Sequence, residues 1–272
     1  MTLVAPNISQ ASMRRVAAAV VLASLTVGAW WASLDRMGGA GMSSRFAVAS
    51  LGFFVLLWVL MMAAMMFPSV WPAVAIYGLI VRRRAPGGTR QLGRAATFVA
   101  GYLGSWTAFG LVAFGLLAAA RTAGLDTLSD AELGRYLVAP VALAGALYQV
   151  APFKQACLRH CRGPLSFFME HWRDGARGAF LMGARHGGYC VGCCWMLMLV
   201  LLAIGVMSIT WMAVVSVAIA VEKLAPTGWA RRASGLLTVG LTVLALVALV
   251  RPSWLPGVGG MGGMDDMNTP MR

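Results

Sequence analysis

Long uninterrupted apolar runs constrain this chain more than any other feature of its sequence. A helix needs roughly 20 apolar residues to cross a hydrocarbon core of about 30 Å, and several runs approach or exceed that length. Hydrophobic residues make up 60% of the chain and charged residues 11%, which lies outside the usual range of soluble domains. Lipid cannot satisfy an open backbone, and the alternating pattern of a membrane barrel is absent. The sequence therefore predicts an all-α, polytopic transmembrane helix bundle.

The apolar runs predict about seven helices in this bundle. Pro68 and Pro72 are expected to kink or break the second helix near its inner end. Residues 163–185 mix aromatic with charged side chains, so we expect this stretch to lie along the inner membrane interface. The expected helices cover approximately residues 16–33, 46–81, 95–120, 136–153, 184–206, 209–221 and 236–250.

The distribution of basic residues predicts the orientation of the bundle. The formal net charge of +13 would suit a nucleic-acid partner, but no soluble stretch is long enough to fold as a binding domain, so we expect none. Most Lys and Arg residues fall instead on loops that share a side with the amino end, as the positive-inside rule requires. We therefore expect a bacterial inner-membrane protein with a cytoplasmic amino end and a periplasmic carboxyl tail.

The segment Tyr189–Trp195 carries the strongest chemical signal. It holds Cys190, Cys193 and Cys194, three of the five cysteines in the chain. On a helix, residues three and four apart share a face, so Cys190 lies beside both of the others. Neighbouring thiols can hold one soft metal ion or exchange a disulfide. We predict that this segment is a metal or thiol site inside a membrane protein.

Two further groups of sulfur atoms are expected at a similar depth. Cys157 and Cys161 lie just past the inner end of the helix at 136–153. At a rise of 1.5 Å per residue, the methionine group begins about 22 Å below the outer end of the second helix. The similar depth predicts that all three groups form one site, although for the methionines taken alone packing is the simpler explanation. The methionines are Met61, Met62, Met65 and Met66.

The remaining polar candidates have simpler explanations. We interpret His171 and His186 as interfacial side chains. Glu222 and Lys223 lie near a helix end. They are either a charged pair whose side chains extend to the membrane interface, or Glu222 is a functional carboxylate, because ionisable groups are costly at membrane depth.

The candidate ligands predict which metal is bound. Thiolates and thioethers select Cu(I) over hard cations, whereas zinc prefers imidazole or four thiolates in a closed site. Cysteine binding would release protons, so the affinity for the metal should rise with pH.

The chain is expected to divide into three regions. Residues 1–45 are an N-terminal transmembrane helix and outer loop, and residues 46–250 are a metal-binding membrane core. Residues 251–272 form a flexible Met/Gly-rich tail that captures copper outside.

Three motifs resemble a known family. They are Trp-x-Leu-Met-Met-Ala-Ala-Met-Met-Phe-Pro-Ser at 58–69, Gly-Tyr-Leu at 101–103 and the His- and Cys-containing segment at 183–195. They resemble the bacterial predicted metal-binding integral membrane proteins, domain of unknown function 2182, and Glu222-Lys223 also fits. The resemblance covers about residues 58–224. Members are commonly labelled copper chaperones, so the resemblance implies copper handling.

We therefore expect a membrane Cu(I)-binding protein, not an enzyme, that buffers copper or passes it to a cuproprotein or soluble carrier. Lipid and the metal ion are the other expected partners. Two alternatives remain open. A membrane thiol–disulfide oxidoreductase would cycle Cys190–Cys193 and Cys157–Cys161, and a structural subunit of a membrane complex would need neither chemistry.

Overall fold

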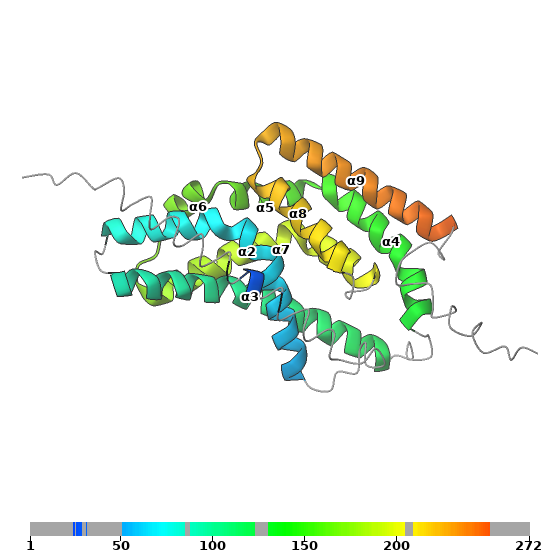
Figure 1. Ribbon diagram of the computed structural model, residues 1–272, viewed down its shortest axis with the longest axis horizontal. Helices are drawn as coiled ribbons and strands as arrows, with labels where there is room; N and C mark the ends of the chain where they lie inside the picture. The colour runs from blue at the N-terminus through cyan, green and yellow to red at the C-terminus, as the bar shows by residue number, and fades with distance from the viewer. Residues whose placement is uncertain are drawn as a thin grey trace, which may run out of the picture. The chain divides into compact units, whose positions relative to one another are not determined.

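The computed structural model describes residues 51–84, 88–122, 130–204 and 209–250, together with a few helical positions between 24 and 31 (Figure 1). The rest of the predicted N-terminal helix and outer loop lies outside the described residues, and so does the Met/Gly-rich tail at 251–272.

The described elements are all helices, which confirms the predicted all-α class. Four of them are long and apolar enough to cross a membrane, over Phe54–Arg84, Gln91–Leu116, Gly175–Ile204 and Thr227–Val250, and Val138–Val150 is a shorter apolar helix. The helices are α2 Leu51–Arg84, α3 Gly88–Thr122, α4 Asp130–Val150, α5 Pro152–Arg162, α6 Pro164–His171, α7 Gly175–Ile204, α8 Ile209–Leu224 and α9 Thr227–Val250.

Helix α2 runs through both of its prolines without a break. A proline inside a helix removes one backbone hydrogen bond and crowds the preceding turn. Membrane helices tolerate this where serine side chains and neighbouring helices satisfy the affected groups. Beside Pro68, the Ser69 hydroxyl donates a hydrogen bond of 2.9 Å to the Met66 carbonyl. The methionine-rich turns and the aromatic end of α2 therefore belong to one continuous helix.

The stretch at 163–185 is not one element, and the helix that was predicted to begin near residue 184 begins earlier, so that boundary was wrong. It divides into α6 and the first turns of α7, which begins at Gly175. The position of this stretch at the inner membrane interface stays a prediction. Gly175 has a φ of 82°, a left-handed conformation that favours glycine and lets the chain turn between the helices. Phe167 and Phe168 of α6 are buried with Tyr77, because their rings pack into an aromatic cluster.

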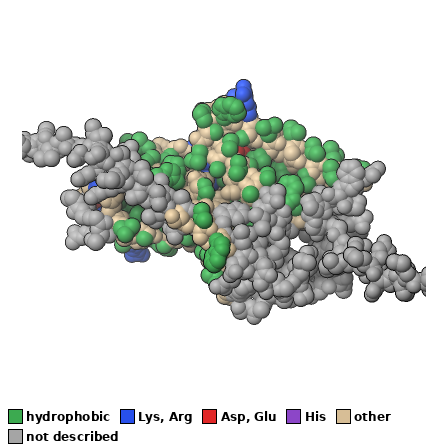
Figure 2. All heavy atoms as spheres, in the orientation of Figure 1, with side chains coloured by type: hydrophobic (Ala, Val, Ile, Leu, Met, Phe, Trp, Pro, Cys, Tyr) green, Lys and Arg blue, Asp and Glu red, His purple; other side chains and the backbone are tan. Residues whose placement is uncertain are grey.

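The chain divides into two compact units. The first holds residues 1–114 and 155–193, and the second holds residues 115–154 and 194–272. In the second unit α9 packs against α4 and α8. Large hydrophobic side chains remain exposed along α9, as expected of a helix that faces lipid, and hydrophobic side chains are spread over the described face in Figure 2.

Helices α3 and α7 of the first unit meet at glycines. A Cβ atom at Gly101 would overlap the α7 backbone, and one at Gly183 would overlap the carbonyl oxygen of Phe98 on α3. A Cβ at Gly187 would lie 2.7 Å from the carbonyl oxygen of Tyr102. Small residues of this kind let membrane helices approach backbone to backbone. The glycines therefore fix how Tyr102 is placed against α7.

Two glycines of α7, Gly183 and Gly188, test this close contact. We expect Gly183→Ala to lower the free energy of unfolding by about 2 kcal/mol, because the added methyl group meets rigid backbone. Gly188 has no atom within 4 Å of its would-be Cβ. Gly188→Ala should therefore leave stability unchanged or raise it by up to about 1 kcal/mol through helix propensity. Unfolding in detergent would measure both, and equal stability of the two variants would contradict the close contact.

Candidate metal centre

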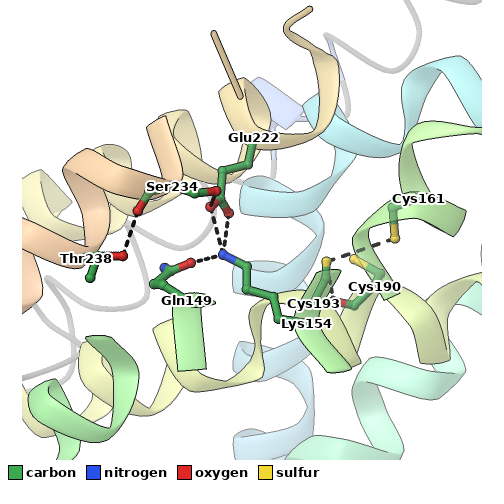
Figure 3. A network of polar contacts seen from close by, with 8 residues as sticks. All are labelled: Gln149, Lys154, Cys161, Cys190, Cys193, Glu222, Ser234 and Thr238. Carbon is green, nitrogen blue, oxygen red and sulfur yellow. Dashed lines mark hydrogen bonds and ion pairs between the residues drawn. The ribbon is translucent and has the colours of Figure 1, made fainter. Parts of the chain in front are cut away.

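Sulfur atoms from three helices converge in the first unit. The Cys190 Sγ atom of α7 lies 4.0 Å from the Met66 Sδ atom of α2. The Cys193 Sγ atom, one turn further along α7, lies 4.0 Å from the Cys161 Sγ atom of α5. Met66, Cys190 and Cys193 are each at most 2% exposed. We refer to Met66, Cys161, Cys190 and Cys193 as the sulfur cluster, whose three thiols are drawn in Figure 3.

The helical spacing of α7 explains why Cys190 and Cys193 face the same part of the unit. Residues three apart are neighbours on a helix surface. The Cys193 thiol donates a hydrogen bond of 3.1 Å to the Cys190 carbonyl, which holds its sulfur on that face. One turn of α7 thus presents one thiol to α2 and another to α5.

Tyr102 adds a polar group that the sequence analysis missed. Its hydroxyl lies 3.0 Å from the Cys190 Sγ atom, and both residues are 1% exposed. The glycine contact between α3 and α7 brings the two together. Either group can donate this hydrogen bond. Tyr102 appeared in the sequence only within the Gly-Tyr-Leu motif, and no spacing rule connects it with a cysteine 88 residues away.

The other predicted sulfur ligands are all buried. Cys157 on α5 lies outside the four candidate spans. Burial raises the pKa of the Cys157 thiol, and the nearby Cys193 raises it further. Cys194 also lies on α7, and it is the first residue of the later of the two segments that make up the second unit. The remaining candidates, which occupy the same turns of α2 as Met66, are Met61, Met62 and Met65.

The sulfur cluster is built from close pairs. Among the described residues, no group of three or more His, Cys, Asp or Glu side chains is arranged to hold a metal ion. None of the five cysteines, all of which lie in the described part of the chain, forms a disulfide. A closed zinc site would need four ligands around one point. Pairs of thiols and a thioether are instead the soft donors that Cu(I) prefers.

The histidines near the sulfur cluster pack against aromatic rings. His160 stacks on Tyr189, with ring centroids 4.2 Å apart and an interplanar angle of 5°. His186 is 3% exposed and packs against Phe98 and Phe167, so its predicted position at the interface was wrong. Because α3 and α7 lie close together, the His186 side chain is buried inside the first unit.

A second polar group lies within the second unit. The Lys154 Nζ atom is 2.7 Å and 2.9 Å from the two carboxylate oxygens of Glu222, and it also donates to the Gln149 side-chain oxygen. The Ser234 hydroxyl donates to Glu222 at 2.6 Å (Figure 3). The sequence analysis left open whether Glu222 pairs with Lys223 or acts as a functional carboxylate, and it did not predict the contact with Lys154. Adjacent residues of a helix do not face each other, and tertiary packing supplies a partner 68 residues away.

Comparison with known protein families gives a match over most of the chain. A family model described as PpoB2, copper chaperone, matches residues 55–248, which include the sulfur cluster, Tyr102 and the Lys154–Glu222 pair. No curated protein and no solved structure matches the chain.

Mild oxidation tests the arrangement of the thiols. We expect an oxidant to link Cys161 with Cys193, because their sulfurs already lie close on different helices. Pairs within one helix, such as Cys157 with Cys161, have Cβ atoms about 5–6 Å apart, whereas a disulfide requires about 3.8 Å. Trypsin can cleave after Arg159, Arg162 and Arg185, so mass spectrometry would identify the linked peptides.

The control for this experiment is Cys161→Ser, which should lose the link between α5 and α7. A dominant link within α5 or within α7 would contradict the observed arrangement.

Proposed function

Because the chain belongs to the PpoB2 copper chaperone family, we propose that it binds Cu(I) at the sulfur cluster and transfers it within or across a membrane. The convergence of sulfur atoms from α2, α5 and α7, of which Cys161 is half-buried and the others are buried, carries this proposal. The four apolar helices that are long enough to span a bilayer support a membrane setting. In our proposal the protein acts as a carrier of copper and has no enzymatic role.

The two close pairs suit different tasks. Cys161 and Cys193 offer two thiolates, which bind Cu(I) tightly once their protons leave. Cys190 and Met66 pair a thiol with a neutral thioether, which binds Cu(I) without releasing a proton of its own. We assign tight binding to the first pair and exchange to the second. Cys157 and Cys194 are further ligands in this proposal, because both thiols are buried in or next to this part of the chain.

The methionines of α2 would form a path for copper. Met61, Met62, Met65 and Met66 form two pairs four residues apart, so each pair stacks along the helix. All four are buried. We propose that the amino end lies in the cytoplasm of a bacterial cell and the carboxyl tail in the periplasm. In this orientation the Met/Gly-rich tail at 251–272 captures or delivers copper on the periplasmic side. A cuproprotein or soluble carrier would receive it.

Thiol–disulfide exchange is the second candidate function, and the Cys161–Cys193 distance is the observation that favours it. The reactive pair would then join α5 to α7. Purified protein that holds no copper but cycles this disulfide reversibly would support exchange over copper transfer.

Substitution of the cluster thiols tests copper binding. Replacing Cys161, Cys190 and Cys193 together with serine should weaken Cu(I) binding by more than about 100-fold, because a hydroxyl is a poor ligand for a soft ion. Competition with a Cu(I) chelator would measure the affinity under anaerobic conditions. The single variant Cys194→Ser would show whether Cys194 also contributes. Wild-type copper stoichiometry in the triple variant would overturn the proposed site.

Substitution of the methionines tests the path. Replacing Met61, Met62, Met65 and Met66 with leucine preserves volume and should cost under about 1.5 kcal/mol for each residue. We expect slower release of copper to an acceptor while tight binding at the thiols persists, and Met66→Leu should account for much of the effect. Met198 is equally buried but lies in the second unit, so Met198→Leu is the matched control. An unchanged release rate in the quadruple variant would identify these methionines as packing residues.

A further inference from the structure

An apolar groove of about 500 Å³ runs between α8 and α9 in the second unit. Every residue that lines it is an alanine, a valine or a leucine. Its walls are open to the outside, since Val217 is 62% exposed and Leu236 is 73% exposed. These side chains offer no hydrogen bonds, so a polar group placed in this α8–α9 groove would be costly to bury. The groove therefore suits an apolar occupant.

The length of the groove matches one leaflet of a bilayer. Along α8 its lining residues extend from Val221 back to Ala213. Eight helical residues rise about 12 Å. One leaflet contributes half of a hydrocarbon core of about 30 Å, which is about 15 Å. Helix α9, the other wall, is long and apolar enough to span a membrane. A single acyl chain could therefore lie along the groove over most of its depth in one leaflet.

The end of the groove nearest the turn between α8 and α9 is basic. Arg232 precedes Leu236 by four residues and Trp229 precedes Ala233 by four, so both lie on the face of α9 that lines the groove. The Arg232 Cζ atom is 5.5 Å from the centre of the Trp229 ring, and Trp229 is 64% exposed. Exposed tryptophan beside a basic residue is typical of the level of the lipid headgroups. Arg231, the preceding residue, is exposed as well.

The basic end of the groove is not neutralised by α8 or α9. Glu222 is the only acidic residue of these two helices. It is 2% exposed, and its carboxylate accepts hydrogen bonds from Lys154 and Ser234 inside the unit. Neither helix therefore supplies a carboxylate for Arg231 or Arg232, and this end of the groove favours an anion.

Charge complementarity favours a phospholipid over a second copy of the chain. Copies in one bilayer share an orientation, so a symmetric pair packed groove to groove would bring Arg231 and Arg232 of both copies to the same depth, where like charges repel. A phospholipid supplies an acyl chain for the groove and a phosphate for the arginines. Arginine suits this role because its planar guanidinium group can donate two hydrogen bonds to one phosphate.

We propose that the α8–α9 groove binds an anionic phospholipid, with one acyl chain along the groove and the phosphate at Arg231 and Arg232. Basic pockets between membrane helices bind anionic headgroups in this way. The inference rests on the membrane setting of the proposed function and is independent of copper binding.

Native mass spectrometry tests this inference. The full-length chain, extracted from membranes in detergent and stripped of lipid, is mixed with equal amounts of dioleoyl phosphatidylglycerol and dioleoyl phosphatidylcholine. Their acyl chains are identical, so the ratio of bound lipids reports on the headgroup. The wild type should retain the anionic lipid in preference by about 10-fold or more, and Arg231→Gln with Arg232→Gln should abolish the preference.

The chain offers a matched control for the arginine pair. Arg83 and Arg84 are also adjacent and exposed at the end of a candidate span, and the Arg84 Cζ atom lies 4.6 Å from the centre of the Trp172 ring. Arg83→Gln with Arg84→Gln removes the same charge in the first unit and should keep the preference. Equal loss in the two double variants would show only a general attraction of basic residues for anionic lipid, and it would overturn this inference.

A third variant tests the groove itself. Ala218 is a half-buried lining residue, so Ala218→Leu adds apolar volume to the groove while both arginines remain. It should lower retention of the anionic lipid by about 10-fold, with thermal unfolding in detergent as the check on folding. Equal retention of the two lipids by the wild type, or a dimer that excludes lipid, would overturn this inference and leave copper binding intact. Recovery of the chain in the soluble fraction without detergent would overturn the proposed membrane setting as well.

Discussion

The contact between the backbones of α3 and α7 is the constraint on which the sulfur cluster depends. In lipid, helices gain little from burying apolar surface against each other, so close backbone packing at small residues takes over as a source of specificity. Gly183 and Gly187 allow α3 to lie directly on α7. That contact places the Tyr102 hydroxyl against Cys190. Larger residues at these glycines would separate the helices, and the cysteine face of α7 would lose this neighbour.

Sulfur suits the interior of such a bundle because it is inexpensive to bury. Neutral thiols and thioethers pack as apolar groups and place no charge in the membrane until a metal arrives. The copper chaperone family match and the close sulfur pairs are compatible with each other. In the proposed function the cost appears on loading, when the thiols lose their protons.

Local patterns were sufficient for part of the site. The period of the helix predicted that Cys190 and Cys193 share a face, and α7 bears this out. The length of the apolar runs predicted spanning helices, and four of the described helices meet that requirement. The sequence did not predict every helix boundary or every pair of residues in contact. Helix α7 begins at Gly175 instead of near residue 184, and the contact between Lys154 and Glu222 was not predicted.

The sequence by itself determined the all-α class, the family and the set of soft donors, because hydropathy, residue type and short spacings are properties of neighbouring residues. Only the tertiary structure decided that Cys161 meets Cys193, that Cys190 meets both Met66 and Tyr102, and that Lys154 meets Glu222. These partners lie between 32 and 124 residues apart in the chain. Their meeting depends on where helices cross, and a crossing is set by the packing of two surfaces at once, which no single segment encodes.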